Sequence, residues 1–506
     1  MRERSSRPKR PFRFLLALAF ALPPLAGAQT LSWVEADTAQ APSAFLDVAT
    51  DADGNAIAVG RYQGSFRMGG HVLESDAARS LFVARISRAG KVLWVRSIDA
   101  YQTSAVWIAH AATDAGGNAV LALHIDDFTN PVRIADSLVP SPQGPFLVKL
   151  NGEGRVAWIL TDNPNGTRPN TDYTTWHDLG TDGLGNIYAT GSILRYQSEV
   201  PVKNVFLYKF APDGTPLWKW TPYFNYATLE NRAGRCLAVP PRGGAYVTMS
   251  GSMGNGSLIL AKVEEDGKPA WQHTLKPATG LRSASRLASD PEGGVFLADT
   301  AATSFLFEDS LERSAPDRPL VLARYSAAGE ILWARRYPVA SPPEGLAPAP
   351  WVGFVLAADR SAAQGLGPGD PDSADPAGGL LLAGFSSDGT TRWVQTVRGS
   401  GPGDGGLTGS RLAADAAGVF LAGNFSQALR VGESHLEAPV DGDGANTPAN
   451  LFRIRWDMPG AGIAPPRART ARDRLRIVVQ PAGGVVSFPD GMHAVDACGR
   501  RLIGKP

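Results

Sequence analysis

One short pattern recurs along this chain and constrains its fold more than any other feature. An apolar run carries a Lys or Arg, a turn with Gly follows, and a Trp lies four residues after that Gly. The pattern occupies residues 82–94, 146–158, 206–218, 259–271, 321–333 and 381–393. The basic residue is replaced by Gly384 in the last copy. A strand that ends in a Gly turn and returns with an aromatic residue is typical of a β-hairpin.

A second pattern alternates with the first: a strand, Asp, two residues, Gly, often Asn, and another strand. Its copies lie at residues 47–60, 110–122, 178–191, 236–249, 286–299 and 411–423. A further copy is expected at residues 352–359, where Ala362 replaces the turn Gly. Each repeat period, between 53 and 64 residues from Trp to Trp, therefore contains about four strands.

A four-stranded sheet repeated radially predicts an all-β fold, a β-propeller of seven antiparallel blades. Trp33 precedes the first Asp-Gly hairpin, and no Trp follows Gly460 after the strand-like residues 450–456. We therefore expect the N-terminal strand to complete the last blade beside residues 450–456, which protects the sheet edges. The fixed place of the repeated tryptophans favours packing between blades over sugar stacking. They are Trp33, Trp94, Trp158, Trp218, Trp271, Trp333 and Trp393.

Composition agrees with short strands and narrows the choice of partners. The 56 Gly and 39 Pro residues disfavour long helices. The 49 basic and 48 acidic side chains give a net charge of +1, which disfavours nucleic acid as a partner.

The N-terminus has the features of a secretory signal. Five of the first ten residues are basic, an apolar run covers 14–22, and an Ala-x-Ala site ends at Ala28. We predict export to the medium or cell surface after cleavage of residues 1–28, with no integral membrane span afterwards. Residues 29–460 then form the propeller, 461–474 a Pro/Arg-rich linker, and 475–506 a short β-rich tail. The two cysteines, Cys236 and Cys498, leave their pairing open, and Cys236 is expected to be a buried thiol.

The two repeated patterns, Asp-x-x-Gly-Asn and Lys-x-x-x-x-Gly-x-x-x-Trp, resemble the SBBP-type repeat family of exported bacterial β-propeller proteins. The resemblance covers about residues 31–460 and implies a surface or secreted protein without an assigned enzyme function. The chain departs from the family in blade six and at Pro240, which replaces a turn Asp. Residues 495–502 resemble the last strands of a type IX secretion C-terminal sorting domain; the alternative is a small β tail, packed on the propeller or mobile.

Catalytic and metal-binding motifs are missing from the sequence. HExxH, CxxC, Gly-x-Ser-x-Gly and Walker A patterns do not occur. Asp51–Asn55 resembles the start of a calcium loop, but Tyr62 stands where that loop carries Glu, so a structural turn is the better interpretation. We therefore expect neither a metal nor a cofactor.

The best candidate site comes from the position four residues before each turn Asp. It begins the innermost strand of each blade, so its side chains should form a ring near one mouth of the central channel. The ring would hold Asp47, His110, Asp178, Cys236, Arg286, Val355 and Arg411, with His177 beside Asp178. This predicts a site for a polar or anionic ligand. The alternative is that the arginines pair with neighbouring carboxylates and buried water to satisfy the strand ends.

Aromatic residues outside the repeat positions are a second set of binding candidates. They lie in or near the loops that flank blade three, and they are Tyr173, Trp176, Tyr223, Phe224 and Tyr226. The favoured function is a non-catalytic binding or adhesion scaffold for a protein or carbohydrate partner. The alternatives are an enzyme, either a quinoprotein-like dehydrogenase or a lyase or hydrolase that uses His110, His177 and Asp178, and a purely structural surface protein.

Overall fold

The computed structural model describes most of the repeat region as β-strands. The described residues are 30–39, 43–99, 105–126, 131–139, 143–161, 172–197, 200–222, 234–250, 258–275, 285–300, 306–307, 310–311, 320–337, 342–360, 379–400, 407–437, 449–458 and 493–495. The predicted signal at 1–28, the linker at 461–474 and most of the tail lie outside them. Among the described residues, no helix is long and apolar enough to cross a membrane.

Antiparallel runs of four strands are the building unit of the fold, and each unit is named here by its first strand. The β2 unit joins β2 (Ala44–Thr50), β3 (Ala56–Met68), β4 (His71–Ile86) and β5 (Val92–Asp99). The β6 unit joins β6 (Ala105–Thr113), β7 (Ala119–Asp126), β10 (Gln143–Leu150) and β11 (Val156–Thr161). The β12 unit joins β12 (Asp172–Thr181), β13 (Ile187–Gln197), β14 (Val200–Phe210) and β15 (Pro216–Trp220).

The remaining units follow the same order. The β16 unit joins β16 (Gly234–Ala238), β17 (Ala245–Ser250), β18 (Leu258–Val263) and β19 (Pro269–Leu275). The β20 unit joins β20 (Arg286–Ser289), β21 (Val295–Thr300), β24 (Leu320–Tyr325) and β25 (Ile331–Tyr337). The β26 unit joins β26 (Pro343–Ala349), β27 (Gly353–Arg360), β28 (Gly379–Phe385) and β29 (Thr391–Ser400). The β30 unit joins β30 (Leu407–Ala414), β31 (Gly418–Phe425), β34 (Ala449–Asp457) and, from the other end of the chain, β1 (Thr30–Ala39).

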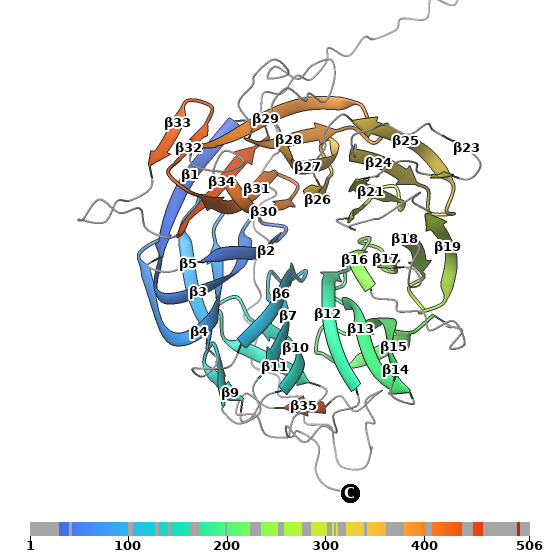
Figure 1. Ribbon diagram of the computed structural model, residues 1–506, viewed down its shortest axis with the longest axis horizontal. Coiled ribbons are helices and arrows are strands. Elements are labelled where there is room, and N and C mark those ends of the chain that lie inside the picture. The colour runs from blue at the N-terminus through green and yellow to red at the C-terminus, as the bar shows by residue number, and fades with distance from the viewer. Residues whose placement is uncertain are drawn as a thin grey trace, which may run out of the picture.

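The units stand around a common centre, so the chain has a propeller-like all-β fold (Figure 1). Their first strands line that centre and form a closed cycle of contacts: β2, β6, β12, β16, β20, β26 and β30, with β30 again beside β2. The predicted partner of the N-terminal strand is present, because β1 runs antiparallel to β34 from Thr30–Asp457 to Ala39–Ala449. A buried ion pair stabilises the contact between β1 and β34, since Arg453 Nη2 donates to Asp37 Oδ1 at 3.0 Å.

Short hairpins extend several units at their outer edges. The hairpin of β8 (Val132–Ile134) and β9 (Ser137–Val139) pairs with β5 of the preceding unit. The hairpin of β32 (Ala428–Val431) and β33 (Ser434–Glu437) pairs with β29 in the same manner. The outer part of β3 pairs with β1 through Thr38–Arg67 and Ala39–Phe66, and this contact merges the β30 and β2 units into one ten-stranded sheet. In the tail, β35 (His493–Val495) pairs with β11.

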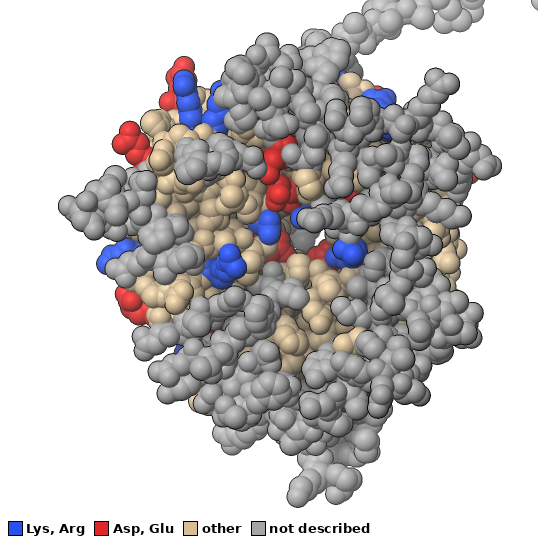
Figure 2. Space-filling model, viewed as in Figure 1, with Lys and Arg blue, Asp and Glu red and all other residues tan. Residues whose placement is uncertain are grey.

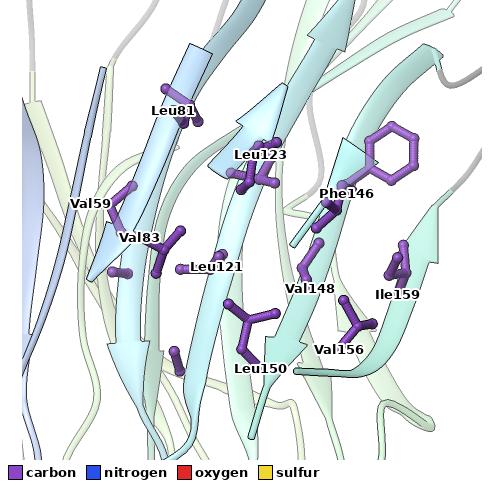
Figure 3. Close-up of a cluster of buried hydrophobic side chains, with 14 of the residues drawn as sticks. Val59, Leu81, Val83, Leu121, Leu123, Phe146, Val148, Leu150, Val156 and Ile159 are labelled. Atoms are coloured by element: carbon purple, nitrogen blue, oxygen red, sulfur yellow. The ribbon is translucent and has the colours of Figure 1, made fainter. Parts of the chain in front are cut away.

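The hydrophobic core lies between the faces of neighbouring units. Figure 3 shows one such layer, in which Val59 and Val83 of the β2 unit face Leu121 and Val148 of the β6 unit. All four side chains are fully buried. Because strands buried on both faces must be apolar throughout, the second and third strands of each unit are nearly continuous apolar runs.

Each repeated Trp lies between its own unit and the next. Six indoles donate their Nε1–H to a backbone carbonyl in the Gly turn of the following unit, at 2.7–3.2 Å. The same ring lies against the turn Gly, as Trp94 does against Gly154. The donors are Trp33, Trp94, Trp158, Trp218, Trp271 and Trp333. Trp393 instead stacks on Trp351, with ring centroids 6.1 Å apart.

The basic residue of the repeat makes a parallel set of contacts. Arg85 pairs with the turn Asp51 of its own unit at 2.7 Å and donates to Gly117 O of the next unit at 2.8 Å. Arg455 bonds Asp415 and Gly54 O in the same way, at 2.9 and 3.2 Å. Both guanidinium groups are buried, and hydrogen bonds on both sides satisfy the charge that burial would otherwise penalise.

The predicted position of the repeat in the β26 unit, at residues 352–359, was wrong. Val355 lies in the second strand, fully buried and paired with Ala347, so it is not at the channel. The first strand is Pro343–Ala349, and a turn through Trp351 follows, closed by the bond from Val352 N to Ala349 O at 3.0 Å. This turn has neither the Asp nor the Gly that marks the others, and its strand is rich in Pro, so neither signal identified it.

A glycine pair tests whether the Trp contact sets how closely the units approach. Gly154 has φ +75° and a Cβ there would lie 2.8 Å from the Trp94 ring, whereas Gly70 has φ +86° with nothing within 4 Å. Both Gly70→Ala and Gly154→Ala should lose about 1–2 kcal/mol for a left-handed Ala, and Gly154→Ala should lose about 1–3 kcal/mol more from overpacking. Urea unfolding of the two variants measures the difference. Equal losses of unfolding free energy in the two variants would show that the Trp94–Gly154 contact can accommodate an extra methyl group without cost.

Candidate functional site

A β-bulge shapes the channel end of the innermost strands. The pairing of β2 with β3 shifts register between Phe45 and Asp47, and equivalent shifts precede His110, Asp178, Leu237, Gly345 and Arg411. A bulge adds one unpaired residue and turns the next side chain out of the regular alternation. In these six strands the bulge lies at or directly before the ring position, and the ring side chain faces the next unit, although residues such as Asp47 and Arg411 keep a partner in their own sheet. The pairing of β20 with β21 shows no register shift, and Arg286 pairs there with Ala298.

The ring side chains bond the backbone of the following unit. Carboxylates accept from the amide one residue after the neighbouring ring position: Asp47 Oδ2 from Ala111 N at 2.9 Å, and Asp178 Oδ2 from Leu237 N at 2.7 Å. Donors bond the carbonyl one residue before it: Cys236 Sγ donates to Ser285 O at 2.7 Å, Arg286 Nε to Glu344 O at 3.2 Å, and Arg411 Nε to Leu46 O. These contacts form a belt of side chain–backbone bonds around the channel, here called the channel belt.

Gly345 takes the ring position of the β26 unit because a larger residue would not fit. A Cβ on Gly345 would lie 2.6 Å from Leu412 Cβ of the next unit. The adjacent Glu344 supplies the side chain instead, and its Oε2 lies 3.6 Å from Arg411 Nη1. Glu344 was missed by the sequence analysis because the strand that carries it was not recognised.

The belt separates its charges into two arcs. Asp47, His110 and Asp178 follow one another on β2, β6 and β12, and Arg286 and Arg411 lie on β20 and β30. Figure 2 shows acidic and basic side chains together around the hollow at the centre of this face. The side chains of Asp47, His110, Asp178, Glu344 and Arg411 each keep about a quarter of their surface exposed, between 24% and 27%, so solvent reaches them.

Two members of the acidic arc formed by Asp47, His110 and Asp178, namely His110 and Asp178, have pKa values above those of the free side chains. His110 Nδ1 lies 3.6 Å from Asp47 Oδ2 and 3.9 Å from Asp178 Oδ1. Burial alone would lower the pKa of His110, but the two carboxylates raise it above its usual value. Burial, followed by the charge of Asp47, raises the pKa of Asp178 to about 6, although His110 opposes the shift. Within the described residues, no group of three or more His, Cys, Asp or Glu side chains is placed to hold a metal ion.

The other predicted residues lie beside the ring, within it, or outside the described part of the chain. His177 is the bulge residue before Asp178, and its Nε2 shares a hydrogen bond with Ser192 Oγ at 2.9 Å. Cys236 is a free, half-buried thiol, and burial raises its pKa. Tyr223, Phe224 and Tyr226 lie outside the described residues, as does Cys498, and Tyr173 is placed in β12 by its backbone alone.

Trp176 is a correction to the sequence analysis. It was expected near a loop as a binding aromatic, but it is 1% exposed in β12. Its ring packs edge-on against Phe206, with centroids 5.3 Å apart. The strand β12 begins at Asp172, earlier than the repeat pattern predicted, and this places Trp176 in the core between units.

Comparisons with known proteins add little to this geometry. No family model matches the chain, and no curated protein matches its sequence. A protein of unknown function from Dyadobacter fermentans shares 10% identity at a TM-score of 0.38, over 84% of this chain and 99% of that one. The endosialidase of phage phi92 shares 9% at 0.39, over 91% and 74%, and a mutant of the Synechocystis apocarotenoid oxygenase shares 11% at 0.36, over 86% and 98%. These likenesses are too weak to support a functional inference.

The acidic arc predicts that stability falls as pH rises. The native state holds the Asp178 proton more tightly than the unfolded chain, so this contribution is lost as pH rises toward the native pKa of about 6. The raised pKa of His110 acts in the same direction. Between about pH 5 and pH 7, wild type should lose about 1 kcal/mol more than Asp178→Asn, since one pKa unit corresponds to about 1.4 kcal/mol.

Urea unfolding at the two pH values measures this loss. Asp53→Asn is the control, because Asp53 is an exposed turn residue away from the belt and the variant should keep the wild-type pH dependence. Parallel pH profiles for wild type and Asp178→Asn would contradict the assignment.

Proposed function

We propose that this chain is an exported seven-bladed β-propeller of the SBBP-repeat type that acts as a non-catalytic binding scaffold. Its partner is a protein or carbohydrate, and its ligand site is the mouth of the central channel. The channel belt is the observation that carries the proposal. It places side chains of both charges around one opening and fixes each by a bond to the neighbouring unit, so the site is formed before a ligand arrives.

The closed cycle of first strands supports the count of seven blades. Each of β2, β6, β12, β16, β20, β26 and β30 contacts the next, and each starts a run of four strands. The ten-stranded sheet then represents two blades joined at their outer edges, as β8 and β32 join other units. The first and last blades meet through β1, which supplies the outermost strand of the β30 unit.

The charges of the belt support a polar or charged ligand. The carboxyl, imidazole and guanidinium groups of the belt are partly exposed, and the low-dielectric protein walls around the channel concentrate their field on a ligand inside it. Apolar ligands find no matching surface among these groups. A charged glycan or a charged segment of a surface protein fits them better.

A binding screen of the full exported chain against glycans and surface proteins tests this function. A ligand of the channel should lose affinity by about 10-fold or more in Arg286→Gln/Arg411→Gln, because a hydrogen bond to a charged group contributes about 1.5–3 kcal/mol. The control is Arg155→Gln/Arg392→Gln, which removes the same charge from exposed positions outside the belt. If the channel pair and the control pair bind alike, the site is elsewhere.

Export makes a separate prediction about the N-terminus. We propose that the signal at 1–28 is removed, so the chain recovered outside the cell should begin at Gln29. N-terminal sequencing of the secreted protein measures this directly. Replacing Ala28 with Trp should block cleavage and leave the chain cell-associated, since the cleavage site requires small residues. Intact residues 1–28 on a secreted chain would contradict the proposal.

A further inference from the structure

The charges of the channel belt are more than the closure of the ring requires. Cys236 bonds the carbonyl of the next unit with an uncharged thiol, at 2.7 Å. Gly345 takes the ring position of its unit without any side chain. Partly buried charges lower stability unless a partner compensates them, and departures from this rule are expected at functional sites. The charged residues at the other ring positions therefore indicate a ligand with matching charges.

Two guanidinium groups of the belt keep donors that no other described residue uses. Arg286 donates its Nε and Nη1 to backbone carbonyls, both at 3.2 Å, and Arg411 donates the same two nitrogens to backbone carbonyls. Within the described part of the chain, neither Nη2 has a hydrogen-bond partner, and neither is among the buried polar atoms that lack one. Both Nη2 groups are thus open to solvent, and each can donate two further hydrogen bonds.

Glu344 joins these two arginines into one group, here called the basic arc (Arg286, Glu344 and Arg411). Its backbone carbonyl accepts from Arg286 Nε at 3.2 Å, and its carboxylate Oε2 lies 3.6 Å from Arg411 Nη1. One carboxylate between two guanidinium groups leaves a positive charge in excess. The basic arc can therefore attract an anionic group and bond it through the Nη2 donors.

The acidic arc has the opposite excess and unused acceptors. Asp47 accepts two backbone amides, both at 2.9 Å, and Asp178 accepts two at 2.7 and 2.8 Å. A carboxylate has about four lone-pair positions, so each of these groups can accept a further donor. His110 Nδ1 lies 3.6 Å from Asp47 Oδ2 and 3.9 Å from Asp178 Oδ1, and one negative charge stays in excess even when the imidazole is charged.

The two arcs are neighbours in the ring of first strands. Arg411 lies on β30 and donates Nε to the carbonyl directly before Asp47 on β2. On the other side β16, with the uncharged Cys236, separates the arcs. Acidic and basic side chains are visible around the hollow at the centre of this face (Figure 2). The ring thus carries charges of opposite sign on different parts of its circumference, and a ligand that matches both parts must itself carry both charges.

We propose that the mouth of the channel binds a zwitterion, with its ammonium group on the acidic arc and its carboxylate on the basic arc. This inference deepens the proposed function and rests on it, because it concerns the same site. The Nη2 donors of the arginines match the oxygens of a carboxylate, and the open lone pairs of Asp47 and Asp178 match the three donors of an ammonium group. Amino acids and short peptides with both ends free are ligands of this class.

Ligand-observed NMR titrations of the full exported chain with oligoglycines test the site. Glycine, diglycine and triglycine carry the same two charges at increasing separation, so the series also measures the spacing that the site accepts. The N-acetyl form of each probe lacks the ammonium group, and the amide form lacks the carboxylate. A suitable pH is about 7, above the native pKa of about 6 for Asp178 and below that of a peptide amine. At least one free oligoglycine should bind at millimolar concentration, and its two blocked forms should bind at least about fivefold more weakly.

Two variants determine whether each arc binds its own end of the ligand. Asp178→Asn removes a charge but keeps an oxygen for the backbone amide, and it should weaken the free oligoglycine at least about fivefold without changing the affinity of the N-acetyl form. Arg411→Gln should weaken the free oligoglycine by as much without changing the affinity of the amide form. A structural role would change the affinity of all three forms alike, so the two patterns separate ligand contact from support of the fold.

Matched variants complete the test. Asp47→Asn and Arg286→Gln alter the other charged member of each arc and should repeat the two patterns, which covers a first variant that does not fold. Asp53→Asn and Arg155→Gln are the controls, because they remove one charge of each sign from exposed positions outside the belt and should bind like wild type.

Three outcomes overturn the proposal. If wild type binds none of the free oligoglycines, or binds a blocked form as tightly as the free one, the zwitterion assignment is wrong. If the variants of the two arcs weaken all three forms alike, the arcs have a structural role. The glycan and protein screen decides the proposed function separately, because a ligand from that screen that depends on Arg286 and Arg411 would still locate a site at the channel mouth.

Discussion

The contact of a repeated Trp with the Gly turn of the next unit, which all of these tryptophans except Trp393 make, is the interaction on which the rest of the structure depends. A four-stranded sheet cannot bury both of its faces alone, so every unit needs a neighbour on each side. The indole fills the gap between units and donates to a backbone carbonyl, as Trp94 does to Gly152 O at 2.9 Å. The Gly is required by the backbone and by the ring together, since it has a positive φ and lies against the indole. This residue pair thus limits how closely successive sheets approach at their outer edges.

The channel belt follows from this spacing. Once the units stand at a fixed distance, the first strands converge at the centre, and in all of them but β20 a bulge helps to turn one side chain toward the next strand. An acid in this position bonds an amide, and a thiol or guanidinium bonds a carbonyl. The ring side chains thus gather at the channel and bond the backbone of neighbouring strands. A ligand site among them stays a prediction. A group held by one bond to the backbone still presents its remaining donors or acceptors to the channel.

Much of the fold could be predicted from the sequence, because each repeat carries the residues that form its turns and its contacts with the next unit. The Asp and Gly turn positions, the basic residue and the Trp recur at fixed spacing, and a fixed spacing implies the same environment each time. The prediction failed in the unit whose turn and ring position are formed by residues other than those of the repeat pattern. The β26 unit turns at Pro350 and Trp351, and its ring position is Gly345 because a Cβ would meet Leu412. Trp176 was predicted to be a binding residue near a loop because it lies outside the repeat position, but its side chain is buried in the core.

The sequence by itself determined the four-stranded antiparallel unit, its turns, and the residues that recur at the start of the first strands. These are local properties, set by turn chemistry and by the alternation of apolar residues. Only the tertiary structure decided which unit each ring side chain bonds, that Glu344 lies beside Arg411, and that Trp176 is buried between two units. Those relations join residues of different units, and the sequence carries no signal for them, because the distance between two units depends on how the whole ring closes.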